Sequence, residues 1–338
     1  MIITLFLTPL LIFFINTIIT NNNFLPNYTG ESHQKFTFNK NIQLSGGIFI
    51  IFYLSLIMFD QSNNLFLIFA FLIFFVGFFS DLRKLNSVNI RLSIQVLIII
   101  VFLVTFELNI YPTRIFFLDN LLRYNYFNYI FLSVCILIIV NGSNFVDGLN
   151  TLNLGYFLSI LIILKIINIQ GNFVLYENLN FLIFSFLVIF IFNLFNKFYI
   201  GDSGAYLNGF FFSYLLINFY QNNTFISPFF IALLLWYPSF EILFSIIRKS
   251  SISLSPFKPD QSHFHQLLYF FLNKKIIKKN LTSNILAANI INIYNFIIFY
   301  IGSTKISNTE LQIILIVISI ITYTFFYSKL LNFRRINS

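Results

Sequence analysis

The chain has 338 residues, of which 58% are hydrophobic and only 9% are charged, and its mean hydropathy is +0.84. A soluble domain of this length needs far more polar surface, and a transmembrane β-barrel would alternate in polarity, so both classes are excluded. The net charge of +9 therefore reflects loops at one membrane face, and no nucleic-acid partner is expected. The single cysteine, Cys135, excludes an intramolecular disulfide framework and a cysteine-based metal site.

Apolar runs predict an all-α, polytopic integral membrane protein with about eleven transmembrane helices in a single domain over residues 1–338. The expected spans are 2–20, 46–59, 64–80, 92–108, 127–141, 153–170, 180–196, 204–220, 226–247, 283–302 and 309–328. The second and fifth spans are short, which predicts tilted or broken helices. The first span has no Lys or Arg before Lys35 and so lacks the basic region of a signal peptide, and we expect it to be retained.

The distribution of basic residues predicts the orientation in the membrane. The loops expected on one side hold 16 of the 20 Lys and Arg residues, and the loops on the other side hold three. The loops on the basic side are 21–45, 81–91, 142–152, 197–203, 248–282 and the C-terminal tail. Because basic loops stay in the cytoplasm, we expect the N-terminus outside, the C-terminus inside and 248–282 as a long cytoplasmic loop.

The most polar boundary between spans is the stretch NGSNFVDGLN after the fifth span. Asn141, Asn144, Asp147 and Asn150 recur at every third position, and such steps drift by about 60° on a helix, so the first three can share one face. Polar groups this dense at a membrane boundary are costly unless they bind something, which predicts an active-site loop. Gly148 would allow a tight turn that points Asp147 into a cleft, and a plain Asp-Gly turn is the alternative.

A second acidic motif follows the third span on the same predicted side. Asp81 ends this span, with Arg83 and Lys84 beside it and Arg91 on the next element. A carboxylate next to fixed cations stays ionised and can orient a metal or a phosphate group. An interfacial ion pair is the alternative interpretation.

A third acidic motif opens the eighth span. Asp202 lies between Gly201 and Gly204, whose small size lets backbone N–H groups and a helix N-terminus approach an anion or its metal partner. Capping of the helix by Asp202 or Ser203 is the alternative.

The stretch SPFKPDQSHFHQLL adds Lys258, His263 and His265. The two histidines face one side if the chain is extended and opposite sides if it is helical. A zinc site needs three or four ligands and finds no thiols here, so phosphate contact through the imidazoles and Lys258 is favoured. Hard oxygen ligands suit Mg²⁺, with Mn²⁺ as a substitute, and the four motifs together predict metal-assisted phosphoryl transfer at the cytoplasmic face.

In this order the motifs resemble those of the polyprenyl-phosphate N-acetylhexosamine-1-phosphate transferases, the glycosyltransferase 4 family that includes the phospho-N-acetylmuramoyl-pentapeptide transferase. The resemblance also covers His33, Lys35, Gly46 and Gly47, and it extends over nearly the whole chain. It implies a Mg²⁺-dependent enzyme of the bacterial inner membrane whose active site faces the cytoplasm. Such an enzyme moves GlcNAc 1-phosphate, or a related N-acetylhexosamine 1-phosphate, from a UDP-sugar to polyprenyl (undecaprenyl) phosphate. It releases UMP and initiates a cell-surface glycan.

The resemblance also implies roles for single residues. Asp202 would be the leading Mg²⁺ ligand, Asp147 would help to organise metal and diphosphate, and Asp81 would orient or deprotonate the acceptor phosphate. The two histidines would contact the donor. Substrate contacts are expected from Asn141, Asn144, Asn150, Arg91, Lys258, His263 and His265.

The chain departs from the family pattern at three positions. Ser80 replaces the first of two adjacent aspartates, Asn150 replaces a second aspartate, and Gln266 stands where a further histidine is common. A catalytically degenerate member is therefore one alternative function, and a multi-span transporter is another. Polar residues gather at one face and not at the midplane, which argues against transport, and Glu241 is expected to pair within the bundle. The sequence leaves the oligomeric state open, with a homodimer as one option.

Overall fold

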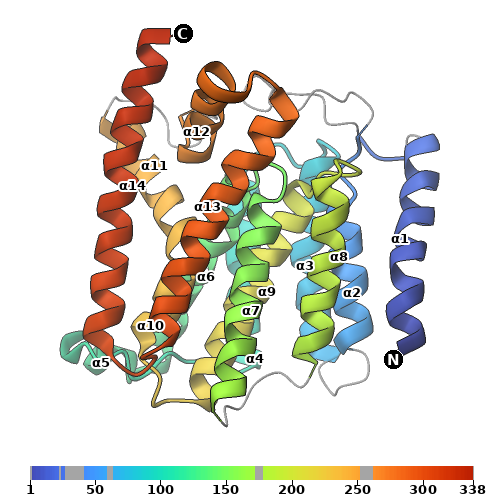
Figure 1. Ribbon diagram of the computed structural model, residues 1–338. Coiled ribbons are helices and arrows are strands. Elements are labelled where there is room, and N and C mark those ends of the chain that lie inside the picture. Colours follow the sequence, from blue (N-terminus) through green and yellow to red (C-terminus); the bar gives the residue numbers. More distant parts are fainter. Residues whose placement is uncertain are drawn as a thin grey trace.

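The computed structural model describes residues 2–22, 24–26, 42–58, 64–171, 178–251 and 262–337, and the regular structure within these ranges is helical. Figure 1 shows a bundle in which most helices run alongside one another. The helices are α1 (Ile2–Asn21), α2 (Gly46–Met58), α3 (Asn64–Asp81), α4 (Val88–Thr105), α5 (Phe116–Leu122), α6 (Asn125–Val146), α7 (Leu152–Gln170), α8 (Leu179–Leu194), α9 (Gly201–Asn222), α10 (Pro228–Leu234), α11 (Trp236–Ser251), α12 (Phe264–Leu272), the π-helical turn η1 (Asn273–Ile277), α13 (Asn280–Ser303) and α14 (Thr309–Asn337).

Ten of the eleven predicted spans coincide with one helix each, and the ninth coincides with the pair α10 and α11. The second, α2, is short at 13 residues as expected. Within the described ranges, six helices are long and apolar enough to cross a membrane, and the α10–α11 pair makes a seventh if it is one span. The six are α3, α4, α6, α7, α13 and α14. The all-helical, membrane-type fold therefore matches the prediction, while the number of crossings and the orientation stay predictions.

Two details of the expected spans are wrong. The fifth span is not a short helix, because α6 has 22 residues and continues through Asn141 to Val146. The ninth span is broken, because α10 and α11 meet at Leu235 with a bend of 71°. Pro238 explains this break: a proline inside a helix has no N–H to donate and its ring clashes with the carbonyl four residues earlier, which here is Leu234, the last residue of α10.

Helix α9 lies at the centre of the bundle, packed against α2, α3 and α6. Nearly all of its residues are buried, as expected of a helix that is apolar on every side. Phe66 of α3 stacks on Tyr214 with ring centroids 4.5 Å apart, and Phe102 of α4 meets Phe210 edge-on at 4.7 Å. These aromatic contacts hold α9 in position along its length, so that its N-terminus opens at one end of the bundle.

The two ends of the bundle differ in chemistry. The chain ends lie at opposite ends of the bundle in Figure 1, and α5 lies at the end opposite to α12. At the α5 end, Arg114 joins three connections by donating to the carbonyls of Phe225 and Ser307, each at 2.8 Å. The predicted site motifs follow α3 and α6, precede α9 and include the start of α12, which places them at the other end.

Candidate active site

Asp81, the last residue of α3, caps the N-terminus of α9. Its Oδ1 accepts a hydrogen bond from the N–H of Asp202 at 2.8 Å, and its Oδ2 accepts one from the N–H of Ser203 at 3.0 Å. Gly201 has a φ of +72°, and a Cβ there would lie 2.8 Å from Asp81 Oδ2. Because the first N–H groups of a helix carry positive partial charge, a carboxylate stabilises the helix start. The cap thus comes from α3 and not from the side chains of Asp202 or Ser203.

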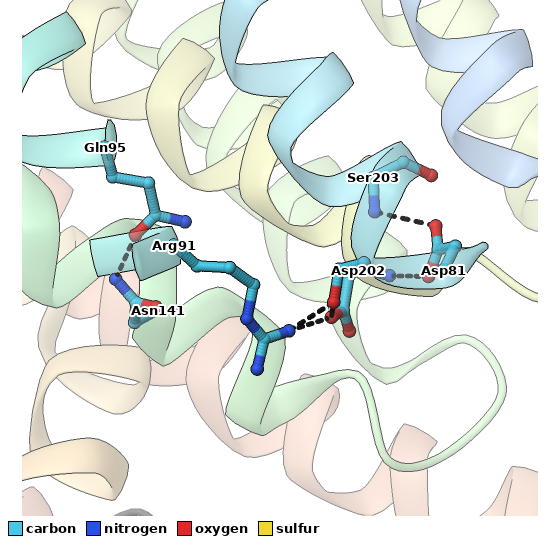
Figure 2. A network of polar contacts seen from close by, with 7 residues as sticks. Asp81, Arg91, Gln95, Asn141, Asp202 and Ser203 are labelled. Carbon is cyan, nitrogen blue, oxygen red and sulfur yellow. Dashed lines mark hydrogen bonds and ion pairs between the residues drawn. The ribbon is translucent and has the colours of Figure 1, made fainter. Parts of the chain in front are cut away.

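Asp202, in the first turn of α9, is held by α3 and α4 (Figure 2). Arg91 donates to Asp202 Oδ2 at 2.8 Å, and the Ser80 hydroxyl donates to the same oxygen at 2.6 Å. Arg91 also donates to the Ser80 hydroxyl. The exposed fraction of the Asp202 side chain is 27%, so the carboxylate reaches the surface of the site while one cation offsets its charge.

One turn further along α4, Gln95 reaches the last part of α6. Asn141 Nδ2 donates to Gln95 Oε1 at 2.9 Å, and Figure 2 shows this pair beside the Arg91–Asp202 pair. Gln95 Nε2 is buried and has no hydrogen-bond partner in the described ranges. The region therefore joins side chains from four helices: α3, α4, α6 and α9.

Asp147 follows the last helical residue of α6 and is half-buried. Burial raises the pKa of Asp147 well above the usual value for a carboxyl group, and the negative charges of Asp202 and Asp81 raise it further. Carboxylates from three separate motifs are therefore close enough to repel one another. Asn144, in the last turn of α6, is a hydrogen-bond partner of Tyr206 on α9.

This concentration of negative charge fits a divalent cation. Asp147 and Asp202 offer oxygen ligands, and Mg²⁺ is commonly held by one or two carboxylates together with waters and substrate phosphates. In the part of the chain that the structure describes, no three His, Cys, Asp or Glu side chains form a self-sufficient metal centre. The donor set therefore suits a metal that arrives with, or is completed by, a phosphate ligand.

The turn after α6 is anchored by buried asparagines of α8 and α13. The N–H of Thr151 donates to Asn193 Oδ1 at 2.6 Å, and Asn292 Nδ2 donates to the Thr151 carbonyl at 2.9 Å. The N–H of Asn150 donates to Asn284 Oδ1 at 2.9 Å. Thr151 has a φ of +69°, which an L-residue rarely adopts, so these bonds hold the turn in a strained conformation.

The histidine pair lies at the N-terminus of α12, with ring centroids 5.7 Å apart and ring planes at 10°. His265 is completely buried, and burial lowers the pKa of its imidazole to about 3. A Cβ at residue 148 would lie 2.2 Å from His265 Nε2. Gly148 is therefore needed because α12 approaches the Asp147 turn closely, and its φ is not in the left-handed region that a glycine-dependent turn would use.

Three predicted residues lie outside the described residues. They are Lys258 and the early motif at His33 and Lys35. His265 and Asn150 are buried beside the Asp147 turn and support it. The remaining predicted site residues lie around the cluster of Asp81, Asp147 and Asp202 or next to it.

Residues 63–220 match the family model described as glycosyl transferase family 4, and this range contains Asp81, Asp147 and Asp202. The resemblance inferred from the motifs is thereby confirmed.

Two curated relatives are similar to the chain. Undecaprenyl-phosphate alpha-N-acetylglucosaminyl 1-phosphate transferase of Thermotoga maritima is 29% identical over 226 residues, which cover 66% of this chain and 66% of the relative. The probable undecaprenyl-phosphate N-acetylglucosaminyl 1-phosphate transferase of Bacillus subtilis is 27% identical over 205 residues, which cover 60% of this chain and 57% of the relative. The similarity thus spans a little under two thirds of the relatives' own lengths.

The three departures from the glycosyl transferase family 4 pattern have definite places in the structure. Ser80 donates to the Asp202 carboxylate. Asn150 donates through its amide to Asn196 Oδ1 at 2.9 Å. Gln266 accepts the N–H of His263 at 3.3 Å and so helps to start α12. Asn150 and Gln266 therefore stabilise the elements around the site, whereas Ser80 contacts the Asp202 carboxylate directly.

Sequence reasoning missed the partners of several site residues. Gln95 and Tyr206 lie within the motif stretches that contain Asp81 and Asp202, but the sequence does not reveal that they pair with Asn141 and Asn144. Glu241 was expected to pair within the bundle, and the structure shows its partner to be His263, with Nδ1 and Oε1 2.9 Å apart. An acidic residue inside an apolar span was the available signal, but it does not reveal which residue it meets.

Proposed function

We propose that the chain transfers an N-acetylhexosamine 1-phosphate, with GlcNAc 1-phosphate as the first choice, from a UDP-sugar to a polyprenyl phosphate. The reaction releases UMP and begins a cell-surface glycan. The observation that carries the proposal is the meeting of Asp81, Asp147 and Asp202 at one end of an apolar bundle. The names of the two similar proteins, which both contain undecaprenyl phosphate and an N-acetylglucosaminyl 1-phosphate transfer, support the choice of acceptor and sugar.

In the proposed reaction an oxygen of the acceptor phosphate forms a bond to the β-phosphorus of the donor. The bond between that phosphorus and the bridging oxygen breaks, and the bridging oxygen leaves with UMP. An acceptor phosphate is largely ionised near neutral pH, so the missing aspartate at Ser80 is not needed as a general base. This makes positioning and charge compensation the main tasks of the site.

The site residues divide these tasks. Asp81 holds the start of α9 and thereby fixes Asp202. Arg91 provides a planar guanidinium whose donors suit phosphate oxygens. Asp147 and Asp202 would hold Mg²⁺, which when bound offsets the charge on the phosphoryl oxygens.

The position of the site at the end of the bundle suits one soluble and one lipid substrate. The acceptor tail can stay in the hydrocarbon layer while its phosphate reaches the membrane surface, where a water-soluble UDP-sugar arrives. The excess of Lys and Arg in the loops at this end supports a cytoplasmic orientation, which we propose to be that of a bacterial inner membrane.

Transport and loss of catalysis are the competing functions. Glu241, one of the few charged residues within the spans, is satisfied by His263 and Tyr323 and lies next to the α12 end of the site. No chain of ionisable residues through the bundle is evident among the described residues. The degenerate alternative rests on Ser80 and Asn150, and the assay below separates it from the proposal.

The test is release of UMP by purified protein in nanodiscs supplied with Mg²⁺, UDP-GlcNAc and undecaprenyl phosphate. Asp202→Asn should abolish release, and Glu310→Gln, an exposed acidic residue at the start of α14, should leave it unchanged. Release undiminished by Asp202→Asn would overturn the role of Asp202. Absence of turnover by folded protein with a panel of UDP-sugars would overturn the proposed function.

A further inference from the structure

Glu241 is a carboxylate buried to 1% exposure, away from the three aspartates, and both of its oxygens are engaged. Oε1 lies 2.9 Å from His263 Nδ1 and accepts the N–H of Phe264 at 3.3 Å. Oε2 accepts the hydroxyl of Tyr323 at 2.8 Å. A buried carboxylate is costly unless its lone pairs are satisfied by hydrogen bonds, and here three donors from α12 and α14 satisfy it.

The broken helix brings Glu241 to this place. Pro238, one turn before Glu241 on α11, presses its carbonyl against α6 so closely that a Cβ at Gly142 would lie 2.3 Å from it. The bend of 71° at Leu235 directs α11 along the last turns of α6. Gly142 belongs to the NGSNFVDG motif, so the motif itself admits the helix that carries Glu241.

His263 lies between Glu241 and the same motif. The ring of Phe145, in the last turn of α6, meets the His263 ring edge-on with centroids 5.1 Å apart. His263 is therefore fixed by Glu241 from α11 on one side and bordered by the residue between Asn144 and Val146 on the other. The neighbouring His265 ring limits rotation further, because the two rings are nearly parallel.

We propose that Glu241 is the positioning residue of His263: it holds the proton on Nδ1 and thereby presents the unprotonated Nε2 to a hydroxyl or N–H group of the donor, from which Nε2 accepts a hydrogen bond. The inference rests on the proposed function for the identity of the donor, but the Glu241–His263 contact does not. A histidine whose Nδ1–H is bound by a carboxylate has one tautomer and one ring orientation, so its contact through Nε2 needs no reorganisation. Tyr323 donates to the second oxygen of Glu241 and so acts on His263 only through Glu241.

The first experiment measures the tautomer without any substrate. The chain has only three histidines, so protein labelled with ¹⁵N-histidine gives few signals, and His263→Phe identifies those of His263. In the wild type, Nδ1 should carry the proton. Glu241→Gln should produce a mixture of tautomers, because an amide can donate as well as accept. The same signals in Glu241→Gln as in the wild type would overturn the proposal.

The second experiment measures donor kinetics. Removing the carboxylate should lower kcat/KM for the UDP-sugar by about 10–100-fold, by analogy with the loss seen when the carboxylate partner of a metal-ligating histidine is removed. Glu241→Gln should have little further effect in a His263→Ala background, since the two residues act as one unit. Additive losses would show that Glu241 acts independently of His263 and would overturn the positioning role.

Matched variants separate positioning from folding. Glu310→Gln makes the same chemical change at an exposed site and should alter neither the ¹⁵N signals nor the kinetics. If Glu241→Gln does not fold, Tyr323→Phe still removes one hydrogen bond from the carboxylate and should shift the tautomer ratio slightly with a loss of kcat/KM of about 2–5-fold. A wild type that shows the Nδ1 tautomer but no turnover would overturn the proposed reaction and leave the Glu241–His263 assignment standing.

Discussion

Replacing Gly148 with alanine tests the closest contact in the site. A Cβ at this position would lie 2.2 Å from Nε2 and 2.9 Å from Cδ2 of His265, far inside van der Waals contact. His265 is fully buried, so its ring has no solvent-facing space into which it can move. The substitution therefore forces either the ring or the Asp147 turn to shift.

The expected cost follows from this crowding. Overpacking a filled core by one methyl group typically costs about 1–3 kcal/mol. Neither nitrogen of His265 has a hydrogen-bond partner among the described residues, so no hydrogen bond opposes a shift of the ring. We therefore expect a loss of about 2 kcal/mol in the free energy of unfolding, the middle of the overpacking values. In a His265→Ala background the ring is absent and the added methyl group should cost almost nothing. The two substitutions should thus be coupled by about 2 kcal/mol.

Unfolding can be followed through the fluorescence of the single tryptophan, Trp236, which is buried and donates to Asn295 Oδ1 at 2.8 Å. UMP release should fall in parallel with stability in Gly148→Ala. Gly171→Ala is the matched control, because Gly171 has an extended backbone with a φ of −161°. Strictly additive effects of Gly148→Ala and His265→Ala would refute the contact between residue 148 and the imidazole.

Three further predictions concern the carboxylates and histidines. Burial lowers the pKa of His265 from 6.5 to about 3, so between these pH values the unfolded chain binds one more proton than the folded chain. The free energy of unfolding should therefore fall as the pH falls below 6.5, by about 2 kcal/mol at pH 5. His265→Phe should lose this pH dependence, and an unchanged dependence of the free energy of urea unfolding on pH in this variant would contradict the prediction. Asp81→Asn weakens the cap of α9, so it should lower the free energy of unfolding by about 1–2 kcal/mol as well as kcat. Asp202→Asn should lower kcat alone. Equal melting temperatures of the two variants would rule out the capping role of Asp81. Removal of metal by EDTA should abolish UMP release, and added Mg²⁺ should restore it. Ser80→Asp adds negative charge beside Asp202 and should reduce the Mg²⁺ concentration that restores half-maximal release. An unchanged Mg²⁺ requirement would place residue 80 away from the metal.

The electrostatics of the site give Arg91 a special importance. It is the cation that contacts Asp202, and it does so through an atom that also contacts Ser80. A divalent ion at Asp202 would compete for the same Oδ2, so the Arg91 guanidinium would become available for a phosphate oxygen. In the proposed reaction, this arrangement would link metal binding and substrate binding through one carboxylate.

Apolar runs alone predicted where the helices lie, because a helix that faces lipid must be apolar for most of its length and no tertiary contact can replace that requirement. The same reasoning ended this helix at Asn141, whereas α6 continues through the polar Asn144 to Val146. Their partners, Gln95 and Tyr206, make helical polar residues tolerable, and these partners lie on other helices.

The motifs also showed which residues to examine, because carboxylates, amides and glycines at a membrane boundary are costly without a function. Only the tertiary structure decided what each residue does. Asp81 caps α9 by accepting the N–H of Asp202, which lies 121 residues later in the chain. Gly148 leaves room for a histidine from α12, and Gly142 leaves room for the helix that carries Glu241. Such roles depend on the distance between two helices, which tertiary packing sets and which local sequence does not encode.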